Sequence, residues 1–360
     1  MHALLRGFAD EDVDHAPVKS ALCKIRKRIS FKFFEGIFLG LLLQYETHRR
    51  TYKGLRIYAI DGLQLLLPRT DSLLEAGFNG RRVSQHRQSH MLYMYLTHAY
   101  DVLGEVTKDF KYSTGLDEIT DAIEMVAKFE KNSVTIYDRL YISRRIVTAH
   151  KDAKNYFLAR ARRKGVVIEI QDFFKSKKRR AVVEIEGVKV MLIKVYNPKA
   201  KQDDVFVTNL PDEWLTKSII ENLYTKRWEV ENSFRVAVQT MQCEQWHCTH
   251  LNGILQELFA TFWLINFTRI QIALKQKPDK NPLAKEYSKP NFKFILDWVI
   301  GILPRILRKI RGVLRPIKEL MNLSTEKRKH RSRSYPRQLR YPAPNYPYAN
   351  THWDWDVMRK

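Results

Sequence analysis

The stretch LRIYAID, residues 55–61, decides the fold, because it is a run of β-branched and aromatic residues that finishes in an acid. Such a run predicts a β-strand. The stretch VTIYDRLY, residues 134–141, repeats the design and reaches its acid at Asp138. We therefore expect two strands that deliver Asp61 and Asp138 to their C-terminal ends.

The residues around these strands predict further strands and helices. MLYMYLTHAYDVLGEVTKDF, residues 91–110, has two β-rich runs with turn residues between them, which predicts a hairpin. Residues 116–130 have helical spacing of apolar residues with acids near the start. A short helix over 144–150 and a strand within 155–162 should follow the second aspartate.

The chain after residue 164 changes texture twice. Residues 165–210 hold three β-rich pieces with basic turns, which predicts an all-β insertion. Residues 215–242 then predict one long helix, and residues 251–275 a second. The second helix is apolar almost all round, as expected of a helix in the core.

Both ends of the chain are predicted to lie outside the main domain. Residues 1–53 form a small helical N-terminal segment in this interpretation, since residues 20–45 have apolar side chains at three- and four-residue steps. Residues 276–360 form a basic C-terminal extension, and its part beyond Pro304, where Lys and Arg far outnumber acids, is predicted to be a mobile tail. The domain between them covers residues 54–275.

Composition narrows the class of protein. The 360 residues carry 63 Lys and Arg against 39 Asp and Glu, a net charge of +24, which points to a polyanion such as nucleic acid. The most apolar stretches, 36–45 and 258–268, are about half of the roughly 20 residues that a membrane span needs, so no membrane role is expected. Three cysteines make no disulfide framework, which favours a cytoplasmic protein.

The stretch YTKRWEVENSFRVAV, residues 224–238, carries the third acid of interest. Four polar residues recur there at helical steps and should share one stripe: Tyr224, Arg227, Glu231 and Arg235. An amphipathic surface helix with an Arg227 to Glu231 pair explains the helix alone equally well.

The order of the three acids along the chain favours a functional role for that helix. Strand with acid, hairpin, helix, strand with acid, then helix with acid is the order that a ribonuclease-H-like α/β fold uses to gather three carboxylates. Three close carboxylates repel one another unless cations neutralise them. Magnesium, or manganese in its place, suits such oxygen ligands, and two ions about 3.5–4 Å apart serve phosphodiester chemistry.

These residues resemble the bacterial DDE insertion-sequence transposases, specifically the insertion sequence four family. Its signature Y-x2-R-x3-E-x6-K is matched by Tyr224, Arg227 and Glu231, with the expected Trp228. IYAIDG and YDRLY are similar to the family's strands with acids, and residues 20–38 are similar to the segment before its catalytic domain. An insertion between the second aspartate and the glutamate is a further family trait.

The resemblance implies a DNA transposase that cleaves and joins phosphodiester bonds at insertion-sequence ends by a two-metal mechanism. Asp61, Asp138 and Glu231 would be catalytic and hold the metals, while Tyr224 and Arg227 would contact DNA phosphate. Double-stranded DNA, as element ends and target, would be the partner, with a homodimer in the synaptic complex. The protein would be cytoplasmic and associated with the bacterial nucleoid.

The chain departs from the family pattern at the last signature position, where Val238 replaces the lysine. Arg235, one turn earlier, is expected to supply the missing cation, and Arg139, directly after the second aspartate, to assist with DNA binding. Leu140 replaces the glycine of the family's D-R-G-Y. Two alternatives stay open: an inactive remnant that only binds DNA, and a nuclease of the same fold without strand transfer.

Overall fold

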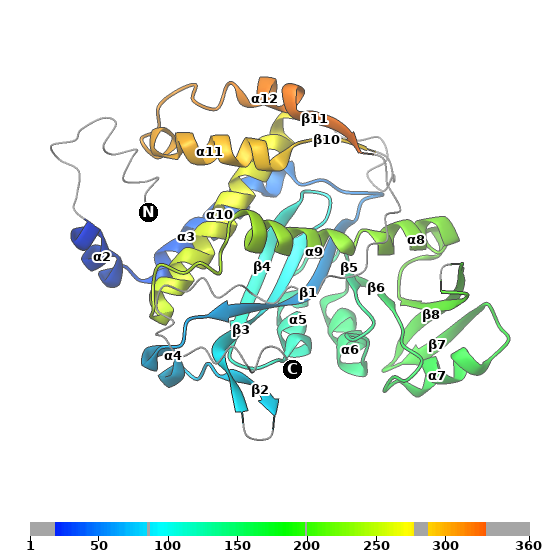
Figure 1. Cartoon of the computed structure of the whole chain (residues 1–360). Helices are drawn as coiled ribbons and strands as arrows, with labels where there is room; N and C mark the ends of the chain where they lie inside the picture. Colours follow the sequence, from blue (N-terminus) through cyan, green and yellow to red (C-terminus); the bar gives the residue numbers. More distant parts are fainter. Residues whose placement is uncertain (1–18, 85–86, 199, 277–286, 329–360) are drawn as a thin grey trace.

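The computed structural model describes residues 19–84, 87–198, 200–276 and 287–328. A nine-stranded mixed sheet forms its centre, with strand order β2-β3-β1-β5-β6-β9-β8-β7 and with β4 paired to β3 (Figure 1). The strands are β1 (Arg56–Leu67), β2 (Gly80–Ser84), β3 (Arg87–Asp101), β4 (Val106–Ser113), β5 (Ser133–Tyr137), β6 (Tyr156–Arg160), β7 (Arg180–Ile185), β8 (Val188–Asn197) and β9 (Gln202–Thr208). Within the described ranges, no helix is long and apolar enough to cross a membrane.

Strands β1, β5 and β6 are parallel neighbours, and β1, β3 and β4 form an antiparallel meander. All five residues of β5 are buried, as expected for a strand covered on both faces. One expectation is wrong in detail: β1 does not end at Asp61 but continues to Leu67 alongside β3. The apolar residues of LQLLL keep it in the sheet, so only its pairing with β5 stops at Ile60.

One face of the sheet is covered by α5 (Glu118–Val126), α6 (Arg144–Ala153) and α7 (Ile168–Lys175). Asp117 and Ser143 cap the first two helices by accepting a hydrogen bond from a backbone N–H in the first turn. Buried residues of these helices pack on β5, β6 and their neighbours, which closes the core on this side.

The other face is covered by α8 (Lys217–Thr225), α9 (Trp228–Arg235), a π-helical turn η4 (Val236–Thr240) and α10 (Leu251–Lys275). The prediction of one long helix over 215–242 is therefore wrong, whereas α10 has the predicted bounds. At the break, the N–H of Arg227 bonds the carbonyl of Tyr224, and the N–H of Glu229 bonds that of Lys226. These bonds span three residues instead of four, so the helix is tighter at this point. The side chains of α9 are therefore rotated about the helix axis relative to those of α8.

The all-β insertion is the second correction. Residues 165–210 contain α7, whose buried residues Ile170 and Phe173 are three positions apart and so follow a helical period. Strands β7, β8 and β9 do form, but β9 pairs with β6. The segment thus extends the central sheet by three antiparallel strands and is of mixed α and β structure.

The first and the last helices of the described residues pack around α10. At the N-terminal side lie α2 (Lys19–Arg28) and α3 (Phe31–Tyr45), and at the C-terminal side α11 (Phe292–Leu307), α12 (Ile317–Ser324), β10 (Tyr287–Pro290) and β11 (Thr325–Arg328). Inside α10, the side chain of Asn266 bonds both the N–H and the carbonyl of Thr107, which fixes the helix to β4. A short 3-10 turn (Glu46–His48) lies between α3 and β1, and α4 (Asp71–Glu75) lies between β1 and β2.

The described part of the C-terminal extension, residues 287–328, is more ordered than its composition predicts. Ile295, Leu296 and Val299 of α11 are buried against the core, and so are Ile317 and Met321 of α12. The prediction of a mobile tail beyond Pro304 is therefore wrong for α12, because apolar residues at helical spacing outweigh the basic residues between them. The prediction for residues 329–360 lies outside the described residues.

Candidate catalytic site

The first two acids lie at the same edge of the sheet. Ile60 and Tyr137 are the last partners in the parallel pairing of β1 with β5, and Asp61 and Asp138 are the next residue of each strand. The carboxyl ends of neighbouring parallel strands are where α/β sheets place ligand-binding groups. The predicted convergence of these two aspartates follows from this register.

Glu231 approaches Asp61 from α9. Burial raises the pKa of Asp61 to about 6; Arg227 opposes that shift, and the negative charges of Asp138 and Glu231 add to it. Asp61 is therefore close enough to both of the other acids for their charges to act on it. Within the described ranges, however, no three His, Cys, Asp or Glu side chains are close enough to form a ready metal cage.

Arg227 lies between two of the acids. Its Nη1 donates to Oδ2 of Asp61 at 3.1 Å, and its Nη2 donates to Oε1 of Glu231 at 2.8 Å. Only 9% of the side chain is exposed. Burial disfavours its charge, but Glu231, Tyr224 and Asp61 more than compensate and raise the pKa of Arg227 above its ordinary value. The pairing with Glu231 is the expected one within the helix, and the contact with Asp61 is new.

The buried arginine is incompletely satisfied in this arrangement. Its Nε has no hydrogen-bond partner among the described residues, and a buried donor without a partner costs free energy. The guanidinium carbon also lies 5.1 Å from the ring centre of Trp228, whose side chain is exposed. Within the described ranges, Arg227 thus keeps one buried donor, Nε, without a partner beside the two Nη atoms that bond the acids.

The remaining predicted residues divide into two groups. Tyr224 is half-buried beside Arg227, packs edge-on against Phe206 with ring centres 5.1 Å apart, and has its pKa raised mainly by burial. Arg139 is exposed directly after Asp138. Arg235 departs from the predicted stripe: it is exposed, bonds Oδ1 of Asn232 at 3.1 Å, and lines a cavity that none of the three acids lines.

A fourth acid, Glu118, stands beside the site, and sequence reasoning missed it. It begins α5 and accepts a 2.9 Å hydrogen bond from the hydroxyl of Tyr141. Burial raises the pKa of Glu118, and the charge of Asp138 adds to the shift. Its carboxylate lies against Gly62, where a Cβ atom would overlap it. The glycine after Asp61 was the available signal, because it leaves room for this side chain.

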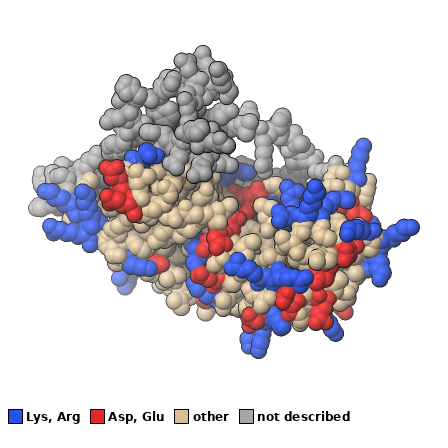
Figure 2. Space-filling model, turned by 90° about the horizontal axis from the view of Figure 1, so that it is seen from below, with Lys and Arg blue, Asp and Glu red and all other residues tan. Residues whose placement is uncertain are grey.

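The chemistry of these groups fits a divalent cation. The ligating atoms of the three acids are all carboxylate oxygens, the kind that magnesium and manganese prefer. The raised pKa of Asp61 shows that the positive charge of Arg227 does not fully balance the burial of this acid and the charges of Asp138 and Glu231. Figure 2 shows acidic side chains in a band near the middle of one face, with Lys and Arg gathered on both sides of it.

Comparison with known proteins identifies relatives of the chain. The sequence model of one family, described as the transposase DDE domain, matches residues 52–267, more than half of the chain. No curated protein matches. Among solved structures, the chain is similar to the piggyBac transposase in the cryo-EM structure of its synaptic complex with hairpin DNA, at 13% identity and a TM-score of 0.41. The alignment covers 84% of this chain and 64% of that one, so the chain spans less than two thirds of that protein.

Proposed function

The chain belongs to the family of transposase DDE domains, and from that premise we propose that it is a DNA transposase that cleaves and joins phosphodiester bonds at the ends of an insertion sequence. The observation that carries the proposal is the approach of Asp61, Asp138 and Glu231, which come from β1, from the end of β5 and from α9. We assign the chain to the insertion sequence four family on its Tyr224, Arg227 and Glu231 spacing.

The proposed fold of the catalytic domain is ribonuclease-H-like. Its support is the strand order β4-β3-β1-β5-β6, in which an antiparallel meander is followed by two parallel strands with α5 and α6 on one face. In this scheme β7 to β9 and α7 are an insertion at the far edge of the sheet, between the second and third acid.

Asp61, Asp138 and Glu231 are the residues that would hold magnesium or manganese, with Glu118 near enough to steer Asp61 through the contact over Gly62. Two bound ions would supply an activated water and charge neutralisation for the leaving oxygen. The chain sets Asp61 in a largely buried position, which raises its pKa to about 6, so a bound cation would favour its charged form.

Arg227, Tyr224 and Arg139 are proposed to bind the phosphate next to the reacting bond. The fork of Arg227 matches the geometry of a phosphate oxygen pair. Because the same fork bonds Asp61 and Glu231, a phosphate that takes over Arg227 frees those two carboxylates. DNA binding and cation binding would in this way support each other.

Double-stranded DNA, as element end and as target, is the proposed partner, and two copies of the chain would bring two ends together. The net charge of +24 supports polyanion binding. A bacterial, nucleoid-associated location follows from the same proposal. Two narrower functions remain as alternatives, a nuclease that stops after cleavage and a remnant that binds DNA without turnover.

The test is a cleavage and joining assay on a supercoiled plasmid that carries the DNA flanking the gene. A transposase nicks it only with magnesium or manganese and joins the cut end to a second duplex. Nicking without joining would identify the nuclease, and binding without nicking the remnant. The matched variants are Asp138→Asn, which should abolish nicking, and Asp172→Asn, an exposed acid of α7 that should not change it.

A further inference from the structure

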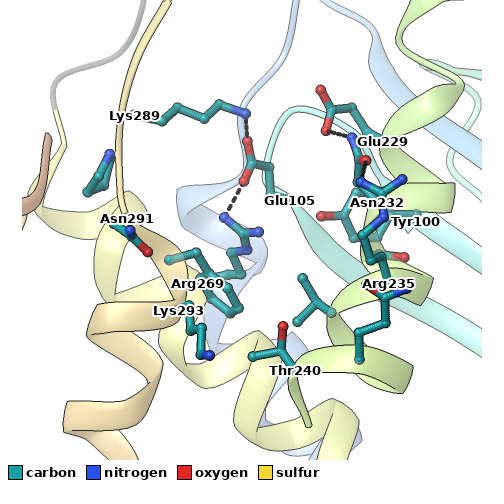
Figure 3. Close-up of a pocket in the computed structure, with 15 residues that line it drawn as sticks. Tyr100, Glu105, Glu229, Asn232, Arg235, Thr240, Arg269, Lys289, Asn291 and Lys293 are labelled. Carbon is teal, nitrogen blue, oxygen red and sulfur yellow. Dashed lines mark hydrogen bonds and ion pairs between the residues drawn. The ribbon is translucent and has the colours of Figure 1, made fainter. Parts of the chain in front are cut away.

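The cavity that Arg235 lines is formed on a side of α9 that none of the three acids shares. It has a volume of about 280 Å³ and is walled by α9 and η4 on one side and by β10 and the start of α11 on the other (Figure 3). Four cationic residues line it, Arg235, Arg269, Lys289 and Lys293, with the two acids Glu105 and Glu229.

The cavity has a built interior. Glu105 is paired with both Arg269 and Lys289. The guanidinium of Arg269 also lies over the ring of Phe292, 3.7 Å from its centre. These contacts join the turn before β4 to α10 and β10 at one place, as the dashed lines from Glu105 in Figure 3 show. Glu105 is thus paired with Arg269 and Lys289 and is not available to pair with Arg235 or Lys293.

Arg235 and Lys293 are exposed and come from opposite walls of the cavity. Arg235 bonds the neutral side chain of Asn232, and Asn232 in turn donates to Glu229 at 3.2 Å. The four cations and two acids leave a charge of 4 − 2 = +2. Positive charge concentrated in a hollow attracts anions more strongly than the same charge on a flat surface.

We infer that this cavity binds a phosphodiester group of a DNA strand, held by Arg235 and Lys293 from its two walls. The inference rests on the proposed function, because that function supplies the DNA. Glu231 and Arg235 are one turn apart on α9, so a strand with one phosphate in the cavity runs along the helix that carries the third acid. The C-terminal segment would in this way form part of the DNA-binding surface.

The variant that tests the inference is Arg235→Ala with Lys293→Ala. Fluorescence anisotropy of a fluorescein-labelled duplex of about 30 base pairs, titrated in EDTA at several salt concentrations, gives the affinity and its salt slope. We expect weaker binding and a slope of log affinity against log salt that is flatter by about 0.9 for each phosphate that the variant no longer neutralises. Thermal melting verifies that the variant is folded.

The matched control is Lys128→Ala with Lys131→Ala. These two exposed lysines lie in the connection between α5 and β5, which leads into the end of β5 opposite to Asp138. They remove the same charge, so equal flattening in both variants would show a general charge effect and overturn the inference. An unchanged slope in the Arg235 and Lys293 variant would overturn it too.

A third result would reassign the cavity. If ATP raises the melting temperature of the wild type but not of the variant, while the DNA slope stays the same in both, the cavity binds free nucleotides and the inference is wrong. Plasmid nicking by the wild type separates this failure from failure of the proposed function. A flatter slope in the variant, together with no nicking by the wild type, would support DNA binding at the cavity and contradict the proposed enzymatic activity.

Discussion

The two sides of helix α9 differ in their charged residues. On the side toward β1, Glu231 and Asp61 share the buried fork of Arg227, so that these acids are paired with a cation. On the side toward α11, Arg235 and Lys293 are exposed, and Arg235 bonds a neutral amide in place of an acid. One helix thus presents a partly neutralised acidic cluster and an open cationic hollow.

Under the proposed function, this difference suits one side of α9 to small cations and the other side to a polymer. A divalent cation needs partly desolvated carboxylates that it can take from a weaker partner, which describes the side of Arg227. A DNA backbone needs accessible cations on a surface that it can reach without unfolding the protein, which describes the side of Arg235. Substitutions on the two sides should therefore have different consequences.

The largest effect is expected from Asp61→Asn or Glu231→Gln. Either change removes a carboxylate that the proposed metal ions need, and loss of one member of a catalytic group costs roughly 10⁴-fold or more in rate. Plasmid nicking with magnesium measures it, while anisotropy should show DNA binding largely intact. A nicking rate within tenfold of the wild-type rate would contradict the proposed catalytic role of these two acids.

The pH dependence of stability offers a test that needs no activity. Asp61 has a pKa of about 6 in the folded chain against 3.8 ordinarily. Its neutral form is therefore favoured by folding, and the stability it contributes below about pH 4 is lost as the pH rises through 6. With allowance for partial exposure, the loss is about 2 kcal/mol.

Urea unfolding of the wild type and of Asp61→Asn at pH 4 and pH 7.5 measures this contribution. Between pH 4 and pH 7.5, the free energy of unfolding of the variant should rise relative to that of the wild type by about 2 kcal/mol. Asp172→Asn, on the surface of α7, should show no such trend. Parallel pH curves for wild type and Asp61→Asn would contradict the burial of this carboxyl.

Arg227→Ala should strengthen metal binding while it weakens catalysis. Without DNA, Arg227 competes with the ion for Asp61 and Glu231, and a charged hydrogen bond is worth roughly 1.5–3 kcal/mol, or about 10- to 150-fold. Calorimetric titration with manganese at pH 7.5 measures the affinity. Arg235→Ala is the control, because it leaves the acids untouched and should not alter manganese binding.

A smaller effect is expected at Gly62. A methyl group there would displace the carboxylate of Glu118, so Gly62→Ala should reduce nicking by up to about tenfold, as Glu118→Gln should. The two changes together should cost no more than one alone, since both disturb the same contact. Gly115→Ala, where a Cβ meets nothing within 4 Å, is the control. Additive losses would mean that Gly62 acts without Glu118.

The sequence predicted the strands of the acidic side better than the end of β1, the helix that carries Glu231 or the side-chain pairings. Asp61 and Asp138 follow runs of strand-forming residues, and their side-by-side placement needed only a parallel pairing. The salt bridge from Arg227 to Asp61 joins residues 166 positions apart, so no local pattern announces it. Glu118 has the look of an ordinary acid at a helix start, where the helix dipole favours acids without any function.

The sequence was least informative on the cationic side. Basic charge and proline content predicted a mobile tail beyond Pro304, but Ile317 and Met321 of α12 are buried against the core. Their burial depends on tertiary packing, which composition does not report. In the same way, Arg235 shares helical spacing with Glu231, yet its side chain serves a different cavity. Periodicity locates a residue on a helix, but the neighbours of that helix decide its role.

The smallest effect is expected from Val238→Lys, which restores the lysine of the family signature. Val238 lies in the π-helical turn, half-buried against the apolar core that α10 completes. The wider turn shifts this position relative to Glu231, so a lysine would lay its stem on apolar surface and reach solvent with its ammonium group. We expect the rate of nicking on a supercoiled plasmid to change by less than about threefold, a free-energy difference under about 1 kcal/mol. Arg235→Ala, measured in parallel, should weaken DNA binding, which would place the cation of this region on the open side of α9. A tenfold or greater gain from Val238→Lys would instead show that the acidic side lacks a cation and that this copy has decayed.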